Sequence, residues 1–210
     1  MPRVNETKRL LEITEIERSY WERGIFPGGM DEVGRGPLAG PVTVACVVLP
    51  PEPLIEGVKD SKKVTSEAKR EKLATLIREG AISFGIGMVG PERIDEINIL
   101  NATKEAYALA YRDMSEPPTV VLVDALTGLD IPAEQHAFIK GDAKSYLIGA
   151  ASLVAKTARD TLMHEYDKMY PQYGFARNKG YGTAEHIAAL KQYGPCPIHR
   201  RSFIGHFVEV

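Results

Sequence analysis

The sequence contains few cysteines, no long apolar run and no excess of one charge. Two cysteines, Cys46 and Cys196, are too few for a disulfide framework or a cysteine-rich metal site, so we expect a cytoplasmic protein. The longest apolar run, residues 42–49, is far shorter than the roughly 20 residues that cross a bilayer, which argues against a membrane span. With 26 basic and 28 acidic residues the net charge is −2, which excludes bulk attraction to nucleic acid but not a local basic patch.

The apolar residues that are present, 44% of 210, can build one sizeable domain with a small appendage. Helical spacing predicts a helix over residues 6–23 as the appendage, and two strands at 30–33 and 42–49 form a hairpin across a Gly-rich turn. Further elements are predicted as a helix at 66–78, a strand at 82–89, a helix at 91–113, strands at 119–123 and 136–140, and helices at 145–168 and 183–192. This order predicts a mixed α/β sheet with helices on both faces.

Four carboxylates stand where a predicted strand or helix begins or ends: Asp31, Glu32, Asp124 and Asp142. Asp124 follows a buried-strand pattern, and ligands bind at such strand ends in α/β sheets, although a plain strand terminator fits equally well. Asp142 precedes a helix, where an N-cap is the alternative. Asp31 and Glu32 are neighbours that a regular strand directs to opposite faces, so we expect the glycines that follow to break the pleat if both serve one site.

A cluster of three or four carboxylates cannot stay ionised without cations, because the negative charges repel one another. Oxygen ligands without a matching Cys or His spacing favour Mg²⁺ or Mn²⁺ over zinc. Substrate phosphates usually complete the coordination of Mg²⁺. The predicted reaction class is therefore metal-dependent phosphate chemistry.

Residues 59–72 are locally basic despite the acidic total. Lys62 and Lys63 stand in a predicted loop beside Ser61, and cationic loop side chains suit phosphate contacts. The later cations of this segment are typical of a solvated helix face. Within residues 59–72, the loop lysines Lys62 and Lys63 are therefore the candidates for nucleic-acid contacts.

Residues 171–210 are also locally basic and are rich in aromatic residues near their start. Tyr181, between glycines and close to cations, is typical of a surface on which a base or sugar stacks. The alternative for this segment is an aromatic mini-core, for which Tyr173 and Phe175 are the better candidates. No catalytic serine triad and no phosphate-binding P-loop is recognisable.

Several motifs in this order resemble those of the bacterial ribonuclease HII family, the type 2 ribonucleases H. They are Gly-Met-Asp-Glu-Val-Gly-Arg-Gly-Pro-Leu-Ala-Gly-Pro-Val at residues 29–42, Asp-Ser-Lys-Lys at 60–63, Val-Asp at 123–124, Gly-Asp-Ala-Lys-Ser at 141–145 and Lys-Gly-Tyr-Gly-Thr at 179–183. Residues 194–203 are similar to the C-terminal segment of that family. The resemblance implies a ribonuclease H-like mixed β-sheet flanked by helices, with an N-terminal helical extension over 1–27 and a catalytic domain over 28–210 that includes a small helical segment from about 170.

By this resemblance Asp31, Glu32, Asp124 and Asp142 are catalytic and hold two divalent cations, Mg²⁺ or Mn²⁺. The implied reaction is hydrolysis of the phosphodiester 5′ of a ribonucleotide in duplex DNA, at an RNA-DNA junction or in an RNA-DNA hybrid, leaving 3′-hydroxyl and 5′-phosphate ends. The implied partners are these nucleic acids, with no membrane, and the protein is expected to be a monomer. Rival interpretations are another nuclease or transferase on the same fold and a non-catalytic hybrid binder.

The resemblance also implies which residues contact the substrate. The Gly34-Arg35-Gly36 turn matches the element that senses the 2′-hydroxyl, the group that distinguishes RNA from DNA. Tyr181 matches the ring that stacks beneath the following deoxyribose. Further expected contacts are Lys62, Lys63, Lys144 and Ser145. The sequence departs from the family pattern at Tyr146, Leu147 and Gly149, which puts the local packing of this helix in question.

Overall fold

A five-stranded mixed sheet forms the centre of the fold, with strand order β3-β2-β1-β4-β5. The computed structural model describes residues 2–59 and 61–209, so Asp60 of the Asp-Ser-Lys-Lys motif lies outside the described residues. The strands are β1 (Gly28–Val33), β2 (Val42–Val48), β3 (Ser83–Val89), β4 (Val120–Asp124) and β5 (Glu134–Phe138). Strands β1, β2 and β3 are antiparallel, whereas β4 runs parallel to β1 and to β5, which confirms the predicted hairpin and mixed sheet.

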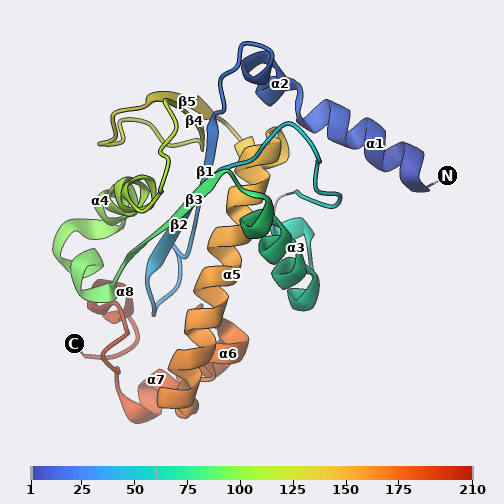
Figure 1. The fold of residues 1–210 in the computed structure, drawn as a ribbon. Helices are drawn as coiled ribbons and strands as arrows, with labels where there is room; N and C mark the ends of the chain where they lie inside the picture. Colours follow the sequence, from blue (N-terminus) through green and yellow to red (C-terminus); the bar gives the residue numbers. More distant parts are fainter. Residues whose placement is uncertain (1, 60, 210) are drawn as a thin grey trace.

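Helices cover both faces of the sheet, as predicted. The main ones are α3 (Glu67–Gly80), α4 (Pro91–Arg112) and α5 (Tyr146–Met169). Figure 1 shows α4 on one face and α5 with α3 on the other. The alternating side chains of β2 serve both cores: Val44 and Cys46 pack on the α4 side, and Ala45 and Val47 pack on the α5 side.

Helix α5 approaches strand β1 closely because residue 29 is glycine. A Cβ atom at Gly29 would lie 2.1 Å from the backbone carbon of Leu147, near the start of α5. Any side chain there overlaps the helix backbone, so only glycine permits this contact. Tyr146 and Leu147, which depart from the family pattern, are both buried, and the Tyr146 hydroxyl accepts a hydrogen bond from the Ile55 N–H at 2.9 Å.

The N-terminal appendage is two helices, not the single helix predicted over residues 6–23. Helix α1 (Pro2–Ile13) ends before Thr14, and α2 (Glu15–Trp21) follows it at an angle (Figure 1). The Thr14 hydroxyl donates a hydrogen bond to the Leu10 carbonyl at 2.7 Å, and its backbone leaves helical geometry with a ψ of 7°. Back-bonding of this kind bends helices, and apolar periodicity does not reveal it.

Two other elements differ in detail from the prediction. Helix α4 is interrupted at Asn98, where φ is 65°, and the Asn98 side-chain oxygen accepts hydrogen bonds from the N–H groups of Leu100 and Asn101 at 3.0 and 3.1 Å. An N-cap inside the helix explains this kink. Strand β5 lies two residues earlier than the predicted 136–140, because its mostly exposed residues carry no apolar alternation and only the pairing with β4 fixes its bounds.

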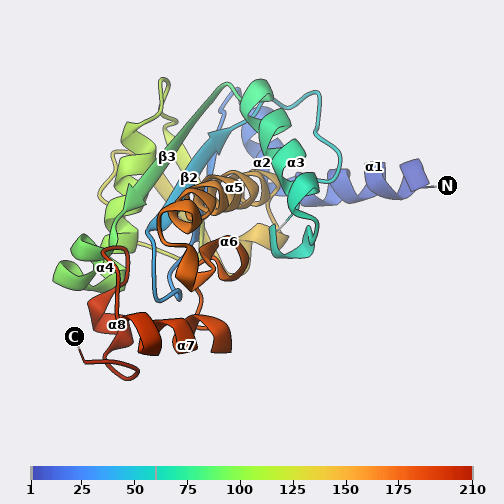
Figure 2. The ribbon, with the colours of Figure 1, turned by 90° about the horizontal axis from the view of Figure 1, so that it is seen from below.

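The C-terminal segment packs against the end of α5 (Figure 2). It contains the 3-10 turn η3 (Pro171–Tyr173) and the helices α6 (Phe175–Asn178), α7 (Ala184–Tyr193) and α8 (Arg201–Ile204). The rings of Tyr173 and Phe175 stack at 5.3 Å in a separate buried core, which confirms the mini-core interpretation for these two residues. Tyr181 is 44% exposed.

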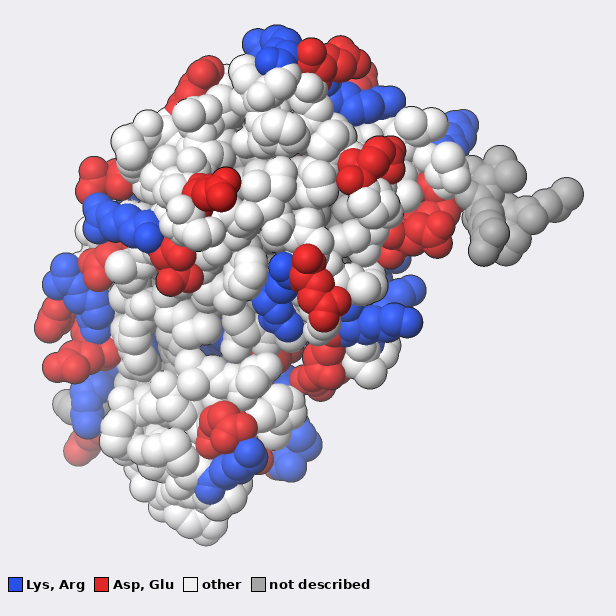
Figure 3. Space-filling view, viewed as in Figure 1, with Lys and Arg blue, Asp and Glu red and all other residues white. Residues whose placement is uncertain are grey.

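The surface carries mixed charge. On the face shown in Figure 3, acidic and basic side chains are interspersed. Within residues 2–59 and 61–209, no helix is long and apolar enough to cross a membrane.

We predict that Gly29→Ala destabilises the fold, because the added methyl group meets the α5 backbone. Overpacking costs about 1–3 kcal/mol, and we expect the upper end because neither backbone can yield without separating β1 from α5. Gly80→Ala is the control: its Cβ would meet only the end of the Ile55 side chain at 3.9 Å, and alanine is the better helix former. Denaturant unfolding measures both; equal free energies of unfolding would contradict the close contact.

Candidate active site

The carboxyl ends of β1 and β4 meet at one edge of the sheet. These strands are parallel with Met30 opposite Val123, so Asp31 and Asp124 follow at neighbouring positions. Asp31 is only 6% exposed. Burial raises the pKa of its carboxyl well above the ordinary value, and the negative charges of Glu32 and Asp124 raise it further. Three of the four predicted carboxylates therefore lie close enough to repel one another.

Glu32 leaves β1 on the face opposite to Asp31. Tyr107 of α4 donates a hydrogen bond from its hydroxyl to Glu32 Oε2 at 2.6 Å, and the Arg35 guanidinium lies 3.3 Å from Oε1. The expected break in the pleat is absent, because β1 stays paired with β2 as far as Val33. The two neighbouring carboxylates thus approach the strand end from opposite faces of the sheet.

Asp142 lies in a 3-10 turn, η2 (Gly141–Ala143), directly before α5. The Gly141 N–H donates a hydrogen bond to Asp124 Oδ1 at 2.7 Å, which joins this turn to the end of β4. The N-cap of α5 is Ser145, whose hydroxyl accepts the Ile148 N–H, so Asp142 lies three residues before the N-cap position of this helix. Lys62 Nζ lies 3.8 Å from Asp142 Oδ2.

The donor chemistry of these side chains fits a hard divalent cation. All four groups are carboxylates, and the repulsion that raises the pKa of Asp31 is what a bound cation relieves. Within the described part of the chain, no three Asp, Glu, His or Cys side chains converge closely enough to hold an ion as they stand.

Two buried arginines hold the loop that contains the Gly34-Arg35-Gly36 turn, and Arg200 bonds the turn itself. Arg200 donates hydrogen bonds to the carbonyls of Gly34, Arg35 and Gly40 at 2.6, 2.9 and 2.8 Å. Arg159 of α5 donates to three more carbonyls in the same way, those of Ala39, Pro41 and Lys179. Burial lowers the pKa of Arg200 to about 9, and the nearby charge of Arg159 adds to the shift. The turn is therefore a rigid element.

Gly36 faces the ring of Tyr181. A Cβ atom on Gly36 would lie 4.0 Å from Tyr181 Cε1 and would meet no other atom within that distance. Gly34 differs, because its φ is +89° and a Cβ there would lie 2.3 Å from Arg159 Nε. The structure thus brings together two elements that are far apart in sequence. Gly34 has a structural role, and Gly36 borders open space next to an exposed aromatic ring.

The other predicted contacts fall into two groups. Lys63, Lys144 and Asp142 line a cleft of about 510 Å³ between the active-site turn and the N-terminal helices. Ser145, in contrast, is fully buried, and its hydroxyl donates to Glu17 while it accepts the Ile148 N–H. This placement indicates a structural role for Ser145 in place of the direct substrate contact that the sequence suggested.

Burial also reduces the basic surface expected for residues 171–210. Arg200 is fully buried, and Lys179 is 9% exposed with its ammonium 3.1 Å from Glu67 of α3. Sequence reasoning also missed Tyr107, because a tyrosine on the apolar stripe of a helix is indistinguishable from an ordinary core residue. Only the tertiary contact with Glu32 reveals it.

The turn before α7 is held by buried histidines. The His186 Nδ1 atom donates to the Tyr181 carbonyl at 2.9 Å, and its Nε2 atom lies 3.0 Å from His199 Nε2. Burial lowers the pKa of His199 to about 4, and burial lowers the pKa of His186 as well. Both rings are buried and belong to the interior of the C-terminal segment.

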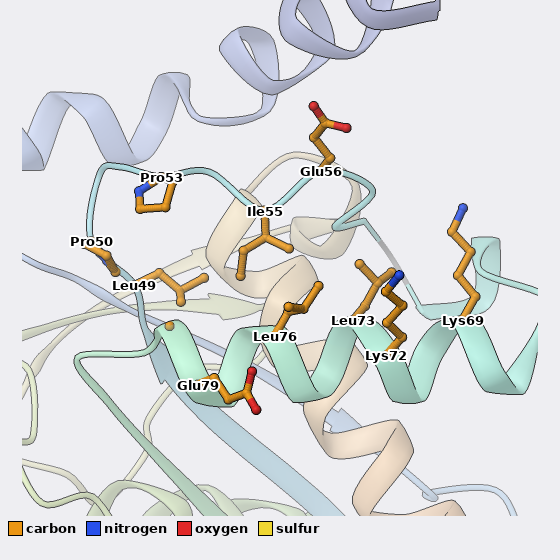
Figure 4. A pocket seen from close by; sticks show the side chains of 11 residues that line it. Leu49, Pro50, Pro53, Ile55, Glu56, Lys69, Lys72, Leu73, Leu76 and Glu79 are labelled. Atoms are coloured by element: carbon orange, nitrogen blue, oxygen red, sulfur yellow. The ribbon is translucent and has the colours of Figure 1, made fainter.

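A second hollow lies away from the carboxylates. Figure 4 shows an apolar groove of about 620 Å³ between α3 and the loop that follows β2, with Leu73 and Leu76 on one wall and Pro53 and Ile55 on the other. None of the four predicted carboxylates lines it. It is therefore separate from the candidate active site.

Solved structures define the class of protein to which this fold and site belong. The crystal structure of ribonuclease H2 from Pyrococcus horikoshii OT3 is similar with a TM-score of 0.69 and 30% identity, covering 83% of this chain and 92% of that one. A Bst-RNase HIII structure in complex with Mn²⁺ has a TM-score of 0.62 at 19% identity, covers 81% and 63% of the two chains and supports the fold alone. The protein thus has a ribonuclease H-like fold.

Sequence comparison then identifies the family. The family model described as ribonuclease HII matches residues 28–206. A ribonuclease HII from Caldanaerobacter subterraneus subsp. tengcongensis is 54% identical over 95% of this chain and 83% of its own length. The chain belongs to the ribonuclease HII family, whose members are hydrolytic, metal-dependent endoribonucleases that cleave RNA in RNA-DNA hybrids.

We predict that Tyr107→Phe weakens metal use without unfolding the protein. The variant keeps the buried ring but removes the hydroxyl that orients Glu32, and loss of such an orienting partner costs about 10- to 100-fold in metal affinity or activity. The measurement is the Mg²⁺ concentration that gives half-maximal cleavage of an RNA-DNA hybrid. Tyr111→Phe, which removes a hydroxyl bonded to the Pro118 carbonyl, is the control. Identical Mg²⁺ curves for the two variants would refute an orienting role for Tyr107.

Proposed function

We propose that this chain cleaves the phosphodiester on the 5′ side of ribonucleotides embedded in duplex DNA or placed at RNA-DNA junctions, leaving 3′-hydroxyl and 5′-phosphate ends. The family cleaves RNA in RNA-DNA hybrids, and the proposal specifies the substrate, the side of cleavage and the ends that are left for this chain. The observation that supports it most is Gly36 facing Tyr181, because this turn directly follows the two carboxylates of β1. A glycine without a side chain, Gly36, and an exposed ring, Tyr181, would then flank the position next to the reacting group.

The four carboxylates Asp31, Glu32, Asp124 and Asp142 would hold two divalent cations, Mg²⁺ or Mn²⁺. Cations bound there would supply Lewis-acid activation of a water nucleophile and charge neutralisation at the leaving 3′-oxygen. The chain itself contributes the anchoring: Asp124 is oriented by the Gly141 N–H, and Glu32 by Tyr107. The raised pKa of Asp31 means that its carboxyl holds its proton to higher pH in the metal-free protein, so cation binding and proton release are coupled there.

Recognition of the ribose is assigned to the turn. The 2′-hydroxyl distinguishes RNA from DNA, and the backbone of Gly34, Arg35 and Gly36 can approach it closely because neither glycine carries a side chain. The carbonyls of Gly34 and Arg35 are already engaged by Arg200, which fixes the turn before substrate arrives. Tyr181 would then stack on the deoxyribose that follows. Rigid placement of these groups avoids the cost of ordering them on binding.

Phosphate contacts are assigned to the lysine side chains around the cleft beside Asp142. Lys62 has a side chain that is 83% exposed, and Lys63 and Lys144 line the cleft. A nucleic-acid strand bound at the four carboxylates would pass these three lysines as it leaves the site. Contacts of this kind position a nucleic acid without reading its sequence. Binding is therefore expected to weaken with rising salt.

We predict that Asp31→Asn and Asp124→Asn lose nearly all cleavage of a duplex with a single ribonucleotide while staying folded. Each substitution keeps the side-chain shape but removes a charged metal ligand, and Asp31→Asn also removes a source of repulsion. Cleavage of end-labelled duplex at saturating Mg²⁺ or Mn²⁺ gives the rate, and thermal unfolding gives the stability. Asp130→Asn, an exposed aspartate far along the β4–β5 loop, is the control. Normal rates in either active-site variant would overturn the assignment of metal ligands.

We predict that Gly36→Ala and Tyr181→Ala impair cleavage at single ribonucleotides more than cleavage of continuous hybrids. The Gly36 methyl group would occupy the space that faces Tyr181 without straining the turn, and stacking on an aromatic ring is worth about 1–3 kcal/mol. The wild-type enzyme should reject duplexes in which the ribose is replaced by deoxyribose or its 2′-O-methyl form. Comparable cutting of the all-deoxy duplex would end the proposal, and equal losses on both substrates would remove the junction-sensing role.

A further inference from the structure

The N-terminal extension places one carboxylate in the protein interior. Glu17 of α2 is fully buried, and its Oε1 atom accepts hydrogen bonds from the Ser145 hydroxyl at 2.5 Å and from the Leu147 N–H at 3.0 Å. Among the described residues it makes no ion pair, and burial raises the pKa of its carboxyl. A buried carboxylate without a cation is costly unless hydrogen bonds compensate, and here Oε1 accepts both of them while Oε2 has no hydrogen-bond partner among the described residues.

Glu17 completes the N-terminal cap of α5. Ser145 accepts the Ile148 N–H with its hydroxyl oxygen and donates its one hydroxyl proton to Glu17. Glu17 also accepts the Leu147 N–H, which has no partner within the helix because it lies in the first turn. The helix dipole favours a negative group at this end. The start of α5 is therefore capped from a second element, 128 residues earlier in the chain.

The turn that carries Asp142 is held at both ends. At its start, the Gly141 N–H donates to Asp124 on β4, and at its end Ser145 is bonded to Glu17 on α2. Inside the turn, the Ser145 N–H donates to the Gly141 carbonyl at 2.8 Å, so the two ends are also linked to each other. A shift of Ser145 is therefore passed on to Gly141 and to Asp142 between them.

The extension is itself fixed at a second point. Glu6 of α1 accepts the Gly57 N–H at 2.8 Å, and Arg9 donates to the Val58 carbonyl at 3.0 Å, while the two side chains pair with each other. These contacts hold the loop that leads to Lys62. The extension thus contacts two segments near the cleft beside Asp142: residues 57–58 through α1, and the start of α5 through Glu17 of α2. These two sets of contacts restrict movement of the extension relative to α5.

We propose that Glu17 is a positioning residue that fixes the turn of residues 141–145, and with it Asp142, relative to Asp124. It touches neither substrate nor cation, and acts through Ser145. The inference rests on the proposed function only in taking Asp142 as part of the reacting site. The alternative is that Glu17 has a purely structural role. In that case its loss lowers the stability of the fold but leaves the turn and the reaction unchanged.

The test compares Glu17→Ala, Glu17→Gln and the control Glu22→Ala in the full chain. Glu22 lies in the same extension, at the exposed end of α2. Amide hydrogen exchange of the metal-free protein is the first measurement, and kcat, KM and the half-saturating Mg²⁺ concentration on an RNA-DNA hybrid are the second. Hydrogen exchange does not depend on the substrate, so this arm stands even if cleavage at single ribonucleotides is not observed.

For Glu17→Ala we expect faster exchange at Leu147 and in the 141–145 turn, with exchange in β2 and β3 unchanged. We also expect kcat to fall about 10- to 100-fold at saturating Mg²⁺ with little change in KM, as for other residues that orient metal ligands. Glu17→Gln keeps an acceptor oxygen for Leu147 and Ser145 and should restore most of the rate. Glu22→Ala should match the wild type in every measurement.

Two outcomes would overturn the proposal. The first is a Glu17→Ala protein of lower stability whose turn exchanges normally and whose kcat and Mg²⁺ dependence are those of the wild type. The second is a double variant, Glu17→Ala with Ser145→Ala, that loses rate as the product of the two single losses, since residues that act through one contact are not additive. If Glu17→Ala does not fold, Ser145→Ala carries the comparison, because it removes the hydroxyl through which Glu17 acts. Normal exchange in the 141–145 turn and a normal rate in Ser145→Ala, with a loss only in stability, would then overturn the proposal.

Discussion

The loop between β1 and β2 depends on two guanidinium groups that are buried without a carboxylate partner among the described residues. Arg159 and Arg200 each donate hydrogen bonds to three backbone carbonyls, and five of these six carbonyls belong to residues 34–41. A buried charge is costly, and loss of the donor would leave several carbonyls unpaired in the interior. The loop, the C-terminal segment and α5 are therefore one unit. This explains how an irregular, Gly-rich loop keeps a single conformation beside the reacting site.

In contrast to the buried arginines, whose charges are compensated by backbone carbonyls, the carboxylates at the sheet edge repel one another. Parallel pairing of β1 with β4 brings Asp31 next to Asp124, and the burial of Asp31 makes its ionised form expensive. Within the residues that the structure describes, no ion pair at Asp31 relieves this cost. Instead the fold surrounds the neighbours with donors, the Tyr107 hydroxyl for Glu32 and the Gly141 N–H for Asp124. The repulsion between the carboxylates therefore remains, while Glu32 and Asp124 are each oriented by a hydrogen-bond donor. A bound cation would relieve this repulsion, so the site is arranged to bind one favourably.

The sequence predicted the regular parts of this arrangement because they depend on local patterns. The hairpin, the helix before β3, α4, α5 and the strand that ends at Asp124 follow from apolar periodicity, Pro, Gly and cap residues. The break at Thr14 and the interruption at Asn98 escaped it, since a side chain there competes with the helix for backbone groups. The burial of Arg200 and the role of Tyr107 escaped it for another reason. Both depend on contacts between residues far apart in sequence, which no local pattern records.

Helix α5 explains how segments from both ends of the chain come to one site. Ser145 at its N-cap bonds Glu17, Ser152 lies beside Asp31, and Arg159 holds the substrate-facing loop. Successive members of this series are two helical turns apart, so they share one face of the helix and lie about 10 Å from one another along it. Because Gly29 lets α5 lie directly against β1, this spacing is transferred to the strand. The turn with Asp142, the carboxylate of Asp31 and the Gly34–Gly36 turn are thereby set at fixed intervals by a single rigid element.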